Sequence, residues 1–319
     1  MRRSEYDVTD RIRTTDTAAV EAEVLALYLS QYPRASPRRI KRAFSDLRRM
    51  YEGADPGFHP CDTEYHDIQH VMDVTLAMAR LMDGHLRSRG GPHRLAEQHY
   101  VLGVVTALYH DIGYIRRRGD RLHRYGAEYT LTHVSRGSAF LRAYLPRLGM
   151  GSHAQAAATL VHFTGYERNA DTIRMADPLL RHLGQMLGSA DIIAQMSDRC
   201  YLEKCRDRLY PEFVLGGLAR RRLPGGRTQI IFKSGDDVVR KTPGFYQNAI
   251  RRLDRQLASA YQYAEPHFGG QNVYLDEMQK NVRYAKQMAT HRGADLLRRT
   301  PPLTLQADVE PYPKELVIR

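Results

Sequence analysis

The sequence predicts an all-α protein. Apolar residues recur at helical spacing along most of the chain, whereas only one short segment, 228–233, has the composition of a strand. The chain has 319 residues, 42% of them hydrophobic, so it is long enough to bury a full core without disulfides. We expect a helical N-terminal extension over residues 1–58, a main helical bundle over 59–290 and an extended C-terminal tail over 291–319.

Two helices are expected in the N-terminal extension. Asp16 and Thr17 form a capping pair in front of apolar residues at helical spacing. The proline-containing stretch 33–37 ends this helix before a second one, which covers about 38–51. The turn-rich segment 53–57 then leads into the main bundle.

The main bundle is expected to consist almost entirely of helices. Periodicity and breaker residues place them near 66–84, 94–112, 125–145, 153–163, 178–206, 243–265 and 271–290. The segment 228–233 lies between turn-forming sequences and predicts a small hairpin or an ordered loop. Prolines at 301, 302, 311 and 313 predict an extended tail.

Composition limits the cellular setting. The three cysteines, Cys61, Cys200 and Cys205, are an odd number without a Cys-x-x-Cys pair, so they indicate neither a disulfide framework nor a zinc knuckle. The N-terminus lacks the apolar stretch of a signal peptide, and the longest apolar run, around 100–109, is too short to cross a bilayer. We therefore expect a cytoplasmic protein with no membrane partner.

Two histidines mark the first candidate site. His66 and His70 are four residues apart on a predicted helix, which would place both imidazoles on one face. A surface location or a satisfied core location is the alternative for such a pair. The second element is His110 followed by Asp111, where an apolar helix ends. A carboxylate in that position is costly to bury unless it is paired or binds a metal.

The third element is Asp191, which lies between small and apolar residues of another predicted helix. Its surroundings favour burial over a solvated or capping role. Two imidazoles and two carboxylates in one place would provide the mixed nitrogen and oxygen ligands that suit zinc, iron or manganese. A carboxylate such as Asp111 can also bridge to a second, harder ion.

These residues carry a family resemblance. The order of these residues resembles the signature of the HD superfamily of metal-dependent phosphohydrolases. In that order His70 is followed about forty residues later by His110-Asp111, and Asp191 comes about eighty residues after that. The resemblance implies an HD-type helical bundle with two divalent ions, Mn, Fe or Zn in the first site and Mg or Mn in the second. It implies Asp111 as the bridging ligand, His66 as general acid, a metal-bridging hydroxide as nucleophile, and a first metal site formed by His70, His110, Asp111 and Asp191.

A second resemblance, to one family within the HD superfamily, suggests the class of substrate. Tyr65-His66-x-x-x-His70 is similar to the opening of class I cyclic-nucleotide phosphodiesterases, and Phe245 matches the aromatic residue that clamps the base in that family. Thr242 stands where those enzymes have a purine-reading glutamine, and Tyr114 stands where they have a histidine. The resemblance thus implies a phosphodiesterase that acts on a cyclic nucleotide or a related small nucleotide.

Two other readings remain open. One is an HD phosphohydrolase of nucleoside phosphates, alarmones or cyclic dinucleotides. The motif His110-Asp111-x-x-Tyr114 fits this alternative, and so does His133, which is a candidate ligand of a second metal. A net charge of +12 also suits a basic nucleic-acid-binding protein that uses the HD core as a scaffold, although complete metal ligands argue against it.

Arginine runs complete the candidate site. Arg116 and Arg117 follow Asp111 closely, and we expect them to bind substrate phosphate at the mouth of the site, because a guanidinium matches phosphate oxygens bidentately. A solvated loop is the alternative for this run. The second run, 220–222, is expected to be a surface feature.

Overall fold

The computed structural model describes residues 2–88, 94–290, 296–310 and 312–313 and confirms the all-α fold. The α-helices are α1 (Thr17–Gln31), α2 (Arg38–Tyr51), α3 (Ile68–Arg87), α4 (Glu97–Leu108), α5 (His133–Tyr144), α6 (Ala154–Leu160), α7 (Pro178–Ser197), α8 (Tyr201–Lys204), α9 (Tyr210–Leu215), α10 (Gly235–Arg255), α11 (Ala264–Phe268) and α12 (Val273–Thr290). Short 3-10 segments join several of them, and a π-helical turn (Cys205–Leu209) links α8 to α9.

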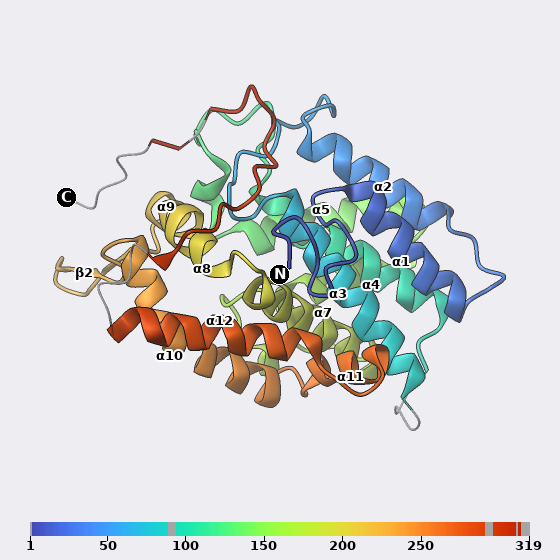
Figure 1. Ribbon diagram of the computed structural model, residues 1–319. Helices are drawn as coiled ribbons and strands as arrows, with labels where there is room; N and C mark the ends of the chain where they lie inside the picture. The colour runs from blue at the N-terminus through green and yellow to red at the C-terminus, as the bar shows by residue number, and fades with distance from the viewer. Residues whose placement is uncertain (1, 89–93, 291–295, 311, 314–319) are drawn as a thin grey trace.

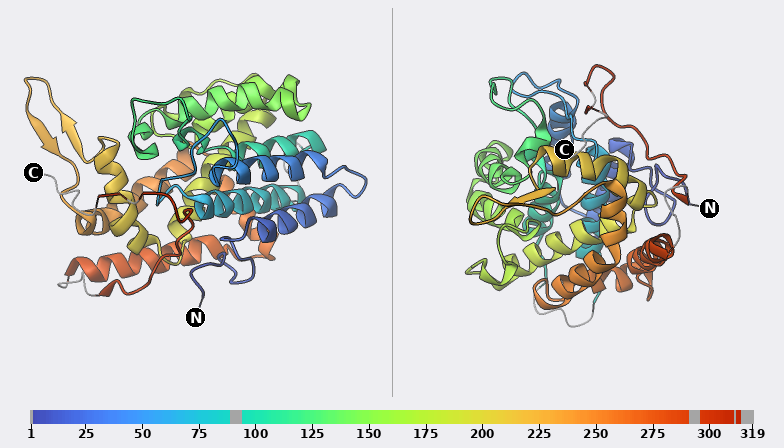
Figure 2. Two further views of the ribbon diagram at one scale, coloured as in Figure 1. Left: turned by 90° about the horizontal axis from the view of Figure 1, so that it is seen from above. Right: turned by 90° about the vertical axis from the view of Figure 1, so that its left-hand side faces the viewer.

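Helix α3 lies at the centre of the bundle. It packs against α1, α4, α7 and α11, and nearly all of its residues are buried. The helices α1, α2, α3 and α4 lie side by side, and α10 and α12 run next to each other along one edge (Figures 1 and 2). This arrangement brings the start of α3 close to segments from distant parts of the chain.

One hydrophobic cluster runs through the bundle from α1 to α12. The N-terminal helices share this cluster: Val20 and Val24 of α1 and Ile40 and Leu47 of α2 are fully buried within it. Asp16 caps α1 as the sequence predicts, because its carboxylate accepts from the backbone N–H groups of the first turn. The described part of the N-terminal segment, residues 2–58, is therefore packed as part of the same core.

Several predicted helix limits are wrong, and local capping explains two of them. Asp67 accepts a hydrogen bond from the backbone N–H of His70, so α3 begins at Ile68 and His66 lies in the preceding loop. Ser234 caps α10 in the same way, and this helix starts at Gly235, earlier than expected. The predicted 178–206 helix is divided into α7 and α8.

Two short strands form the β-sheet of the described residues. β1 (Arg220–Arg222) pairs antiparallel with β2 (Thr228–Ile230), and Arg221 lies opposite Gln229. The hairpin projects from one end of the bundle (Figure 2), and all residues of both strands are exposed. This confirms the hairpin alternative for the strand-like segment and the surface location of the second arginine run.

The described part of the tail is extended, as expected, and packs on the bundle. Tyr312 is buried against Tyr125, and Arg208 donates hydrogen bonds to the carbonyl groups of Pro301 and Pro302. No described helix combines the length and apolar character needed to cross a membrane.

Candidate metal centre

Three elements bring the four predicted ligands together. His70 lies in the first turn of α3, Asp191 lies in α7, and His110 and Asp111 follow the last turn of α4. Because α4 ends at Leu108, the chain turns there and both of these side chains are directed towards α3 and α7. His70, His110 and Asp111 are buried, and the Asp191 side chain is partly exposed.

The ligand atoms lie within a few ångströms of one another. The Nε2 atoms of His70 and His110 are 3.3 Å apart. Asp111 Oδ2 lies 3.3 Å from His70 Nε2 and 3.2 Å from His110 Nε2, and Asp191 Oδ1 lies 3.5 Å from His70 Nε2. The group formed by His70, His110 and Asp191 could hold a metal ion.

The unused bonding capacity of these atoms fits a divalent cation. Asp111 Oδ2 is buried and forms no hydrogen bond to any described residue. His110 donates from Nδ1 to the Ala107 carbonyl at 2.8 Å, which leaves the lone pair of its Nε2 for a ligand bond. Buried polar atoms without partners are costly, and a bound cation would satisfy them.

Electrostatics in the cluster favour its charged forms. Burial by itself lowers the pKa of His110, but the adjacent Asp111 carboxylate outweighs burial and raises this pKa to about 9. Burial also raises the pKa of Asp111, and the neighbouring His110 more than offsets this effect, so the pKa of Asp111 falls well below its usual value. A cation that binds here must displace a proton from the His110 imidazole.

His133 lies on the other side of Asp111. Its Nε2 is 3.7 Å from Asp111 Oδ1, and its Nδ1 donates to the Thr130 carbonyl at 2.7 Å. Burial lowers the pKa of His133. A Cβ atom at Gly113 would lie 1.9 Å from the His133 carbonyl oxygen, so only glycine allows this close approach.

His66 interacts with a carboxylate that the sequence analysis missed. Its Nδ1 donates to Glu212 Oε2 at 2.5 Å, and Glu212 Oε1 accepts from the Tyr65 backbone at 2.7 Å. Burial lowers the pKa of His66, but Glu212 outweighs burial and the net pKa is raised. A single glutamate in the apolar run 209–215 is the signal that could have revealed it.

Tyr114 separates the two outer histidines. Its ring stacks on His66 and on His133, each at 4.3 Å between centroids and 18° between planes. Tyr114 therefore fixes the spacing of His66 and His133 through ring contacts, and its own ring is fully buried.

A cavity of about 450 Å³ opens over this cluster. His66, His70, Asp111, His133 and Asp191 line its polar end. The predicted substrate residues Thr242 and Phe245 line it as well, from α10. Thr242 is buried, whereas Phe245 is about one third exposed, with a relative accessibility of 36%.

The predicted phosphate-binding arginines do not line this cavity. Arg116 donates to Asp62 at 2.9 Å, and Arg117 lies beside the ring of Phe58 in a bridge between two loops. Both face a different part of the surface, because the loop after Tyr114 turns back towards residues 57–62. We therefore correct the expectation that Arg116 and Arg117 lie at the mouth of the site.

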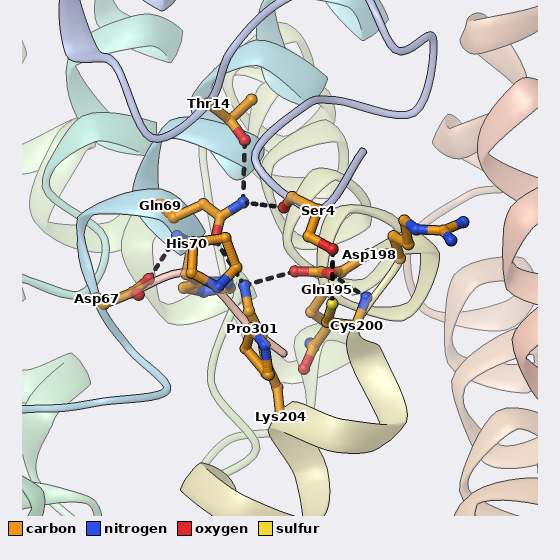
Figure 3. A network of polar contacts seen from close by, with 12 residues as sticks. Ser4, Thr14, Asp67, Gln69, His70, Gln195, Asp198, Cys200, Lys204 and Pro301 are labelled. Carbon is orange, nitrogen blue, oxygen red and sulfur yellow. Dashed lines mark hydrogen bonds and ion pairs between the residues drawn. The ribbon is translucent and has the colours of Figure 1, made fainter. Parts of the chain in front are cut away.

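A polar network surrounds Gln69, the residue that precedes His70 in the first turn of α3 (Figure 3). Lys204 donates to Gln69 Oε1 at 3.0 Å and to Asp198 Oδ2 at 2.6 Å. Gln69 in turn donates to the Ser4 carbonyl of the N-terminal segment at 3.0 Å. These contacts connect the first turn of α3 to α8 and to the chain start.

The fold and the site define an all-α protein with a candidate metal centre at the floor of a cavity. The profile of the Npun_R2479-like family matches residues 56–287, and the chain belongs to this family. The family description states no activity. No match was found among curated proteins.

Proposed function

We propose that this protein is a metal-dependent phosphohydrolase that cleaves a phosphodiester in a small substrate. The observation that carries the proposal is the approach of two imidazole Nε2 atoms and two carboxylates, with Asp111 Oδ2 lacking a hydrogen-bond partner among the described residues. A divalent ion bound there would lower the pKa of water and neutralise charge on phosphoryl oxygens. The HD resemblance supports the same reaction class.

We assign the proton transfer and the metal binding in this reaction to different histidines. His66 lines the cavity beside the ligand cluster, and Glu212 holds its imidazole and favours its protonated form. When water attacks phosphorus it gives up one proton to solvent and a new P–O bond forms; the bond to the leaving oxygen breaks, His66 donates the proton that this oxygen takes up, and His66 then regains a proton from solvent. His66 acts as a general acid in this scheme and His70 as a ligand.

The proposal predicts separate effects for the ligand and the acid. His110→Ala should lose both metal, measured by elemental analysis, and hydrolysis of phosphodiesters by Mn-, Fe- or Mg-loaded protein. His66→Asn should keep its metal while kcat falls by about 10² or more on a substrate with an alkoxide leaving group. The loss should be much smaller with nitrophenolate, which needs little protonation to depart.

Gln247→Ala serves as the control, because Gln247 lines a different cavity and should retain full metal content and rate. Absence of hydrolysis with every metal and phosphate ester would overturn the proposal. Full metal content in His110→Ala would overturn it as well. An equal loss of rate on both leaving groups in His66→Asn would remove His66 from the role of acid.

The nucleotide expected from the resemblance remains a candidate substrate through Phe245, which lines the cavity. The cyclic mononucleotides therefore belong in the same assay.

A further inference from the structure

The wall of the cavity above the metal centre is apolar. Side chains from α5, the π-helical turn, α9, the hairpin flanks and α10 form this wall: Val134, Leu209, Phe213, Leu218, Phe232 and Val238. Phe213 and Phe232 stack with centroids 5.3 Å apart and planes 25° apart. The cavity therefore has a polar floor, where the ligands lie, and a hydrocarbon wall.

The threonine hydroxyl groups in the lining already donate to backbone carbonyls. Thr130 donates to the Ala127 carbonyl at 2.6 Å, and Thr164 donates to the Val161 carbonyl at 2.8 Å. Thr242 donates to the Val238 carbonyl of its own helix at 3.3 Å. None of the three lining threonines has a proton left to donate to a substrate.

Among the described lining residues, Gln195 is the single amide, and its Oε1 accepts from the Tyr65 hydroxyl at 3.2 Å. One lone pair of this oxygen is thus occupied, and a single amide is all that this lining offers for the paired donor and acceptor contacts of a nucleobase edge. A base buried against the apolar wall would lose hydrogen bonds to water and regain few of them from this lining, which opposes binding.

The charge of the lining also limits the substrate. Lys241 is the one Lys or Arg among the described lining residues, and it is engaged with Asp237 at 2.8 Å and with the Ile231 carbonyl. Polyphosphates and dinucleotides carry several negative charges and need several cationic partners. The cavity therefore fits a ligand with one phosphoryl group.

Three large apolar side chains are exposed at this cavity. Leu131 and Tyr166 are 64% and 62% exposed, and Phe245 is the third. Arg252 stacks over the Tyr166 ring at 4.0 Å and donates to the Gly165 carbonyl at 2.7 Å, so the aromatic side chain is held in place. Exposed apolar residues that border a site often contact an apolar ligand.

We propose that the substrate is an amphiphilic phosphodiester, with its phosphoryl group at the metal centre and a hydrocarbon body along the apolar wall. This inference rests on the proposed phosphohydrolase function. Such a molecule can come from solution or from a lipid surface. The hairpin between Leu218 and Phe232 carries the exposed strand 220–222, whose arginines suit lipid phosphates.

The test is a homologous series of nitrophenyl alkyl phosphates with methyl, butyl and octyl chains, used with metal-loaded protein. KM should fall about two- to fourfold per added methylene, as expected when each methylene leaves water. Binding of the corresponding alkyl phosphonates, followed by calorimetry, should show the same trend without turnover. Vesicles of phosphatidylcholine and phosphatidylglycerol form a second arm: hydrolysis there assigns a bilayer source, and hydrolysis of the monomers alone assigns a soluble amphiphile.

Leu131→Ser should weaken the dependence of KM on alkyl chain length. Because Leu131 is exposed, this substitution should leave the fold intact. Leu122→Ser is the matched control, because Leu122 is 88% exposed and does not line the cavity. Rates and phosphonate affinities that do not change with chain length would overturn the inference and leave the phosphohydrolase function intact. Preference for a cyclic nucleotide over the octyl ester would also overturn it. Failure to cleave any ester, with chain-dependent phosphonate binding retained, would overturn the function alone.

Discussion

At the scale of single residues, His66 combines contacts from three parts of the chain. Glu212 accepts its Nδ1 proton, Tyr114 stacks on its ring, and its backbone carbonyl accepts from the Thr63 hydroxyl at 2.8 Å. The imidazole is thereby held in one orientation. A proton donor needs this fixed geometry as well as a raised pKa.

Glu212→Gln tests the role of Glu212 as a positioning residue. Glu212 raises the pKa of His66, so its loss should lower this pKa. Because the acid form of His66 is required, activity falls as pH rises through the pKa, and the basic limb of the kcat profile should move to lower pH in the variant. A glutamine can still accept from the Tyr65 backbone, so the fold should be retained. An unchanged pH profile would show that Glu212 is merely structural.

At the scale of elements, the first turn of α3 links the site to the tail. Asp67 Oδ1 caps the helix at His70, while Asp67 Oδ2 accepts from the Thr304 hydroxyl at 2.6 Å. Asp67 therefore joins the first turn of the helix to a segment more than two hundred residues later in the chain, and Arg208 Nη1 also lies 3.6 Å from the same Oδ2. We expect these contacts to help fix the position of His70.

Asp67→Ala should lower the free energy of unfolding by about 1 kcal/mol or more through loss of the cap. It should also weaken metal binding, since the His70 backbone loses its partner. Asp16→Ala is the matched control, because it removes the cap of α1, a helix that carries none of the candidate ligands, and should leave metal affinity unchanged. Calorimetric titration with the metal measures the affinity of both variants. Equal metal affinity in Asp67→Ala and Asp16→Ala would show that the Asp67 cap does not affect the metal site.

At the scale of the whole molecule, the N-terminal loop is joined to the core by a buried ion pair. Asp7 accepts from Arg80 of α3 at 2.6 Å and from the backbone of Ile12, and Arg80 also donates to the Tyr274 hydroxyl of α12 at 3.1 Å. Both charged side chains are only 3% exposed. Burial by itself raises the pKa of Asp7, but Arg80 outweighs burial and the net pKa is lowered.

Asp7→Asn should therefore cost about 3 kcal/mol of stability near neutral pH, because Arg80 would remain buried without its partner. A lowered folded-state pKa means that the carboxylate contributes fully above its ordinary pKa of 3.8 and that this contribution is lost as pH falls through the folded value. The difference between wild type and variant should thus narrow below about pH 4 in denaturant titrations. The same substitution at Asp10, whose carboxylate pairs with Arg3 at the surface, provides the control and should change the free energy of unfolding little.

The sequence by itself determined the all-α class and the cap at Asp16, and it limited segment 228–233 to a small hairpin or an ordered loop. These depend on hydrophobic periodicity and on capping and turn residues, which act between neighbours in the chain. It also singled out the four candidate ligands, because isolated polar residues in apolar helices need a partner.

Only the tertiary structure decided which distant groups meet. His66 lies outside the helix in which it was expected, and its partner Glu212 is 146 residues away. Arg116 was expected at the site on its closeness to Asp111 in sequence, yet it pairs with Asp62. The reason is physical: sequence spacing governs contacts within a helix or turn, whereas the lining of a cavity is set by the packing of helices from separate parts of the chain.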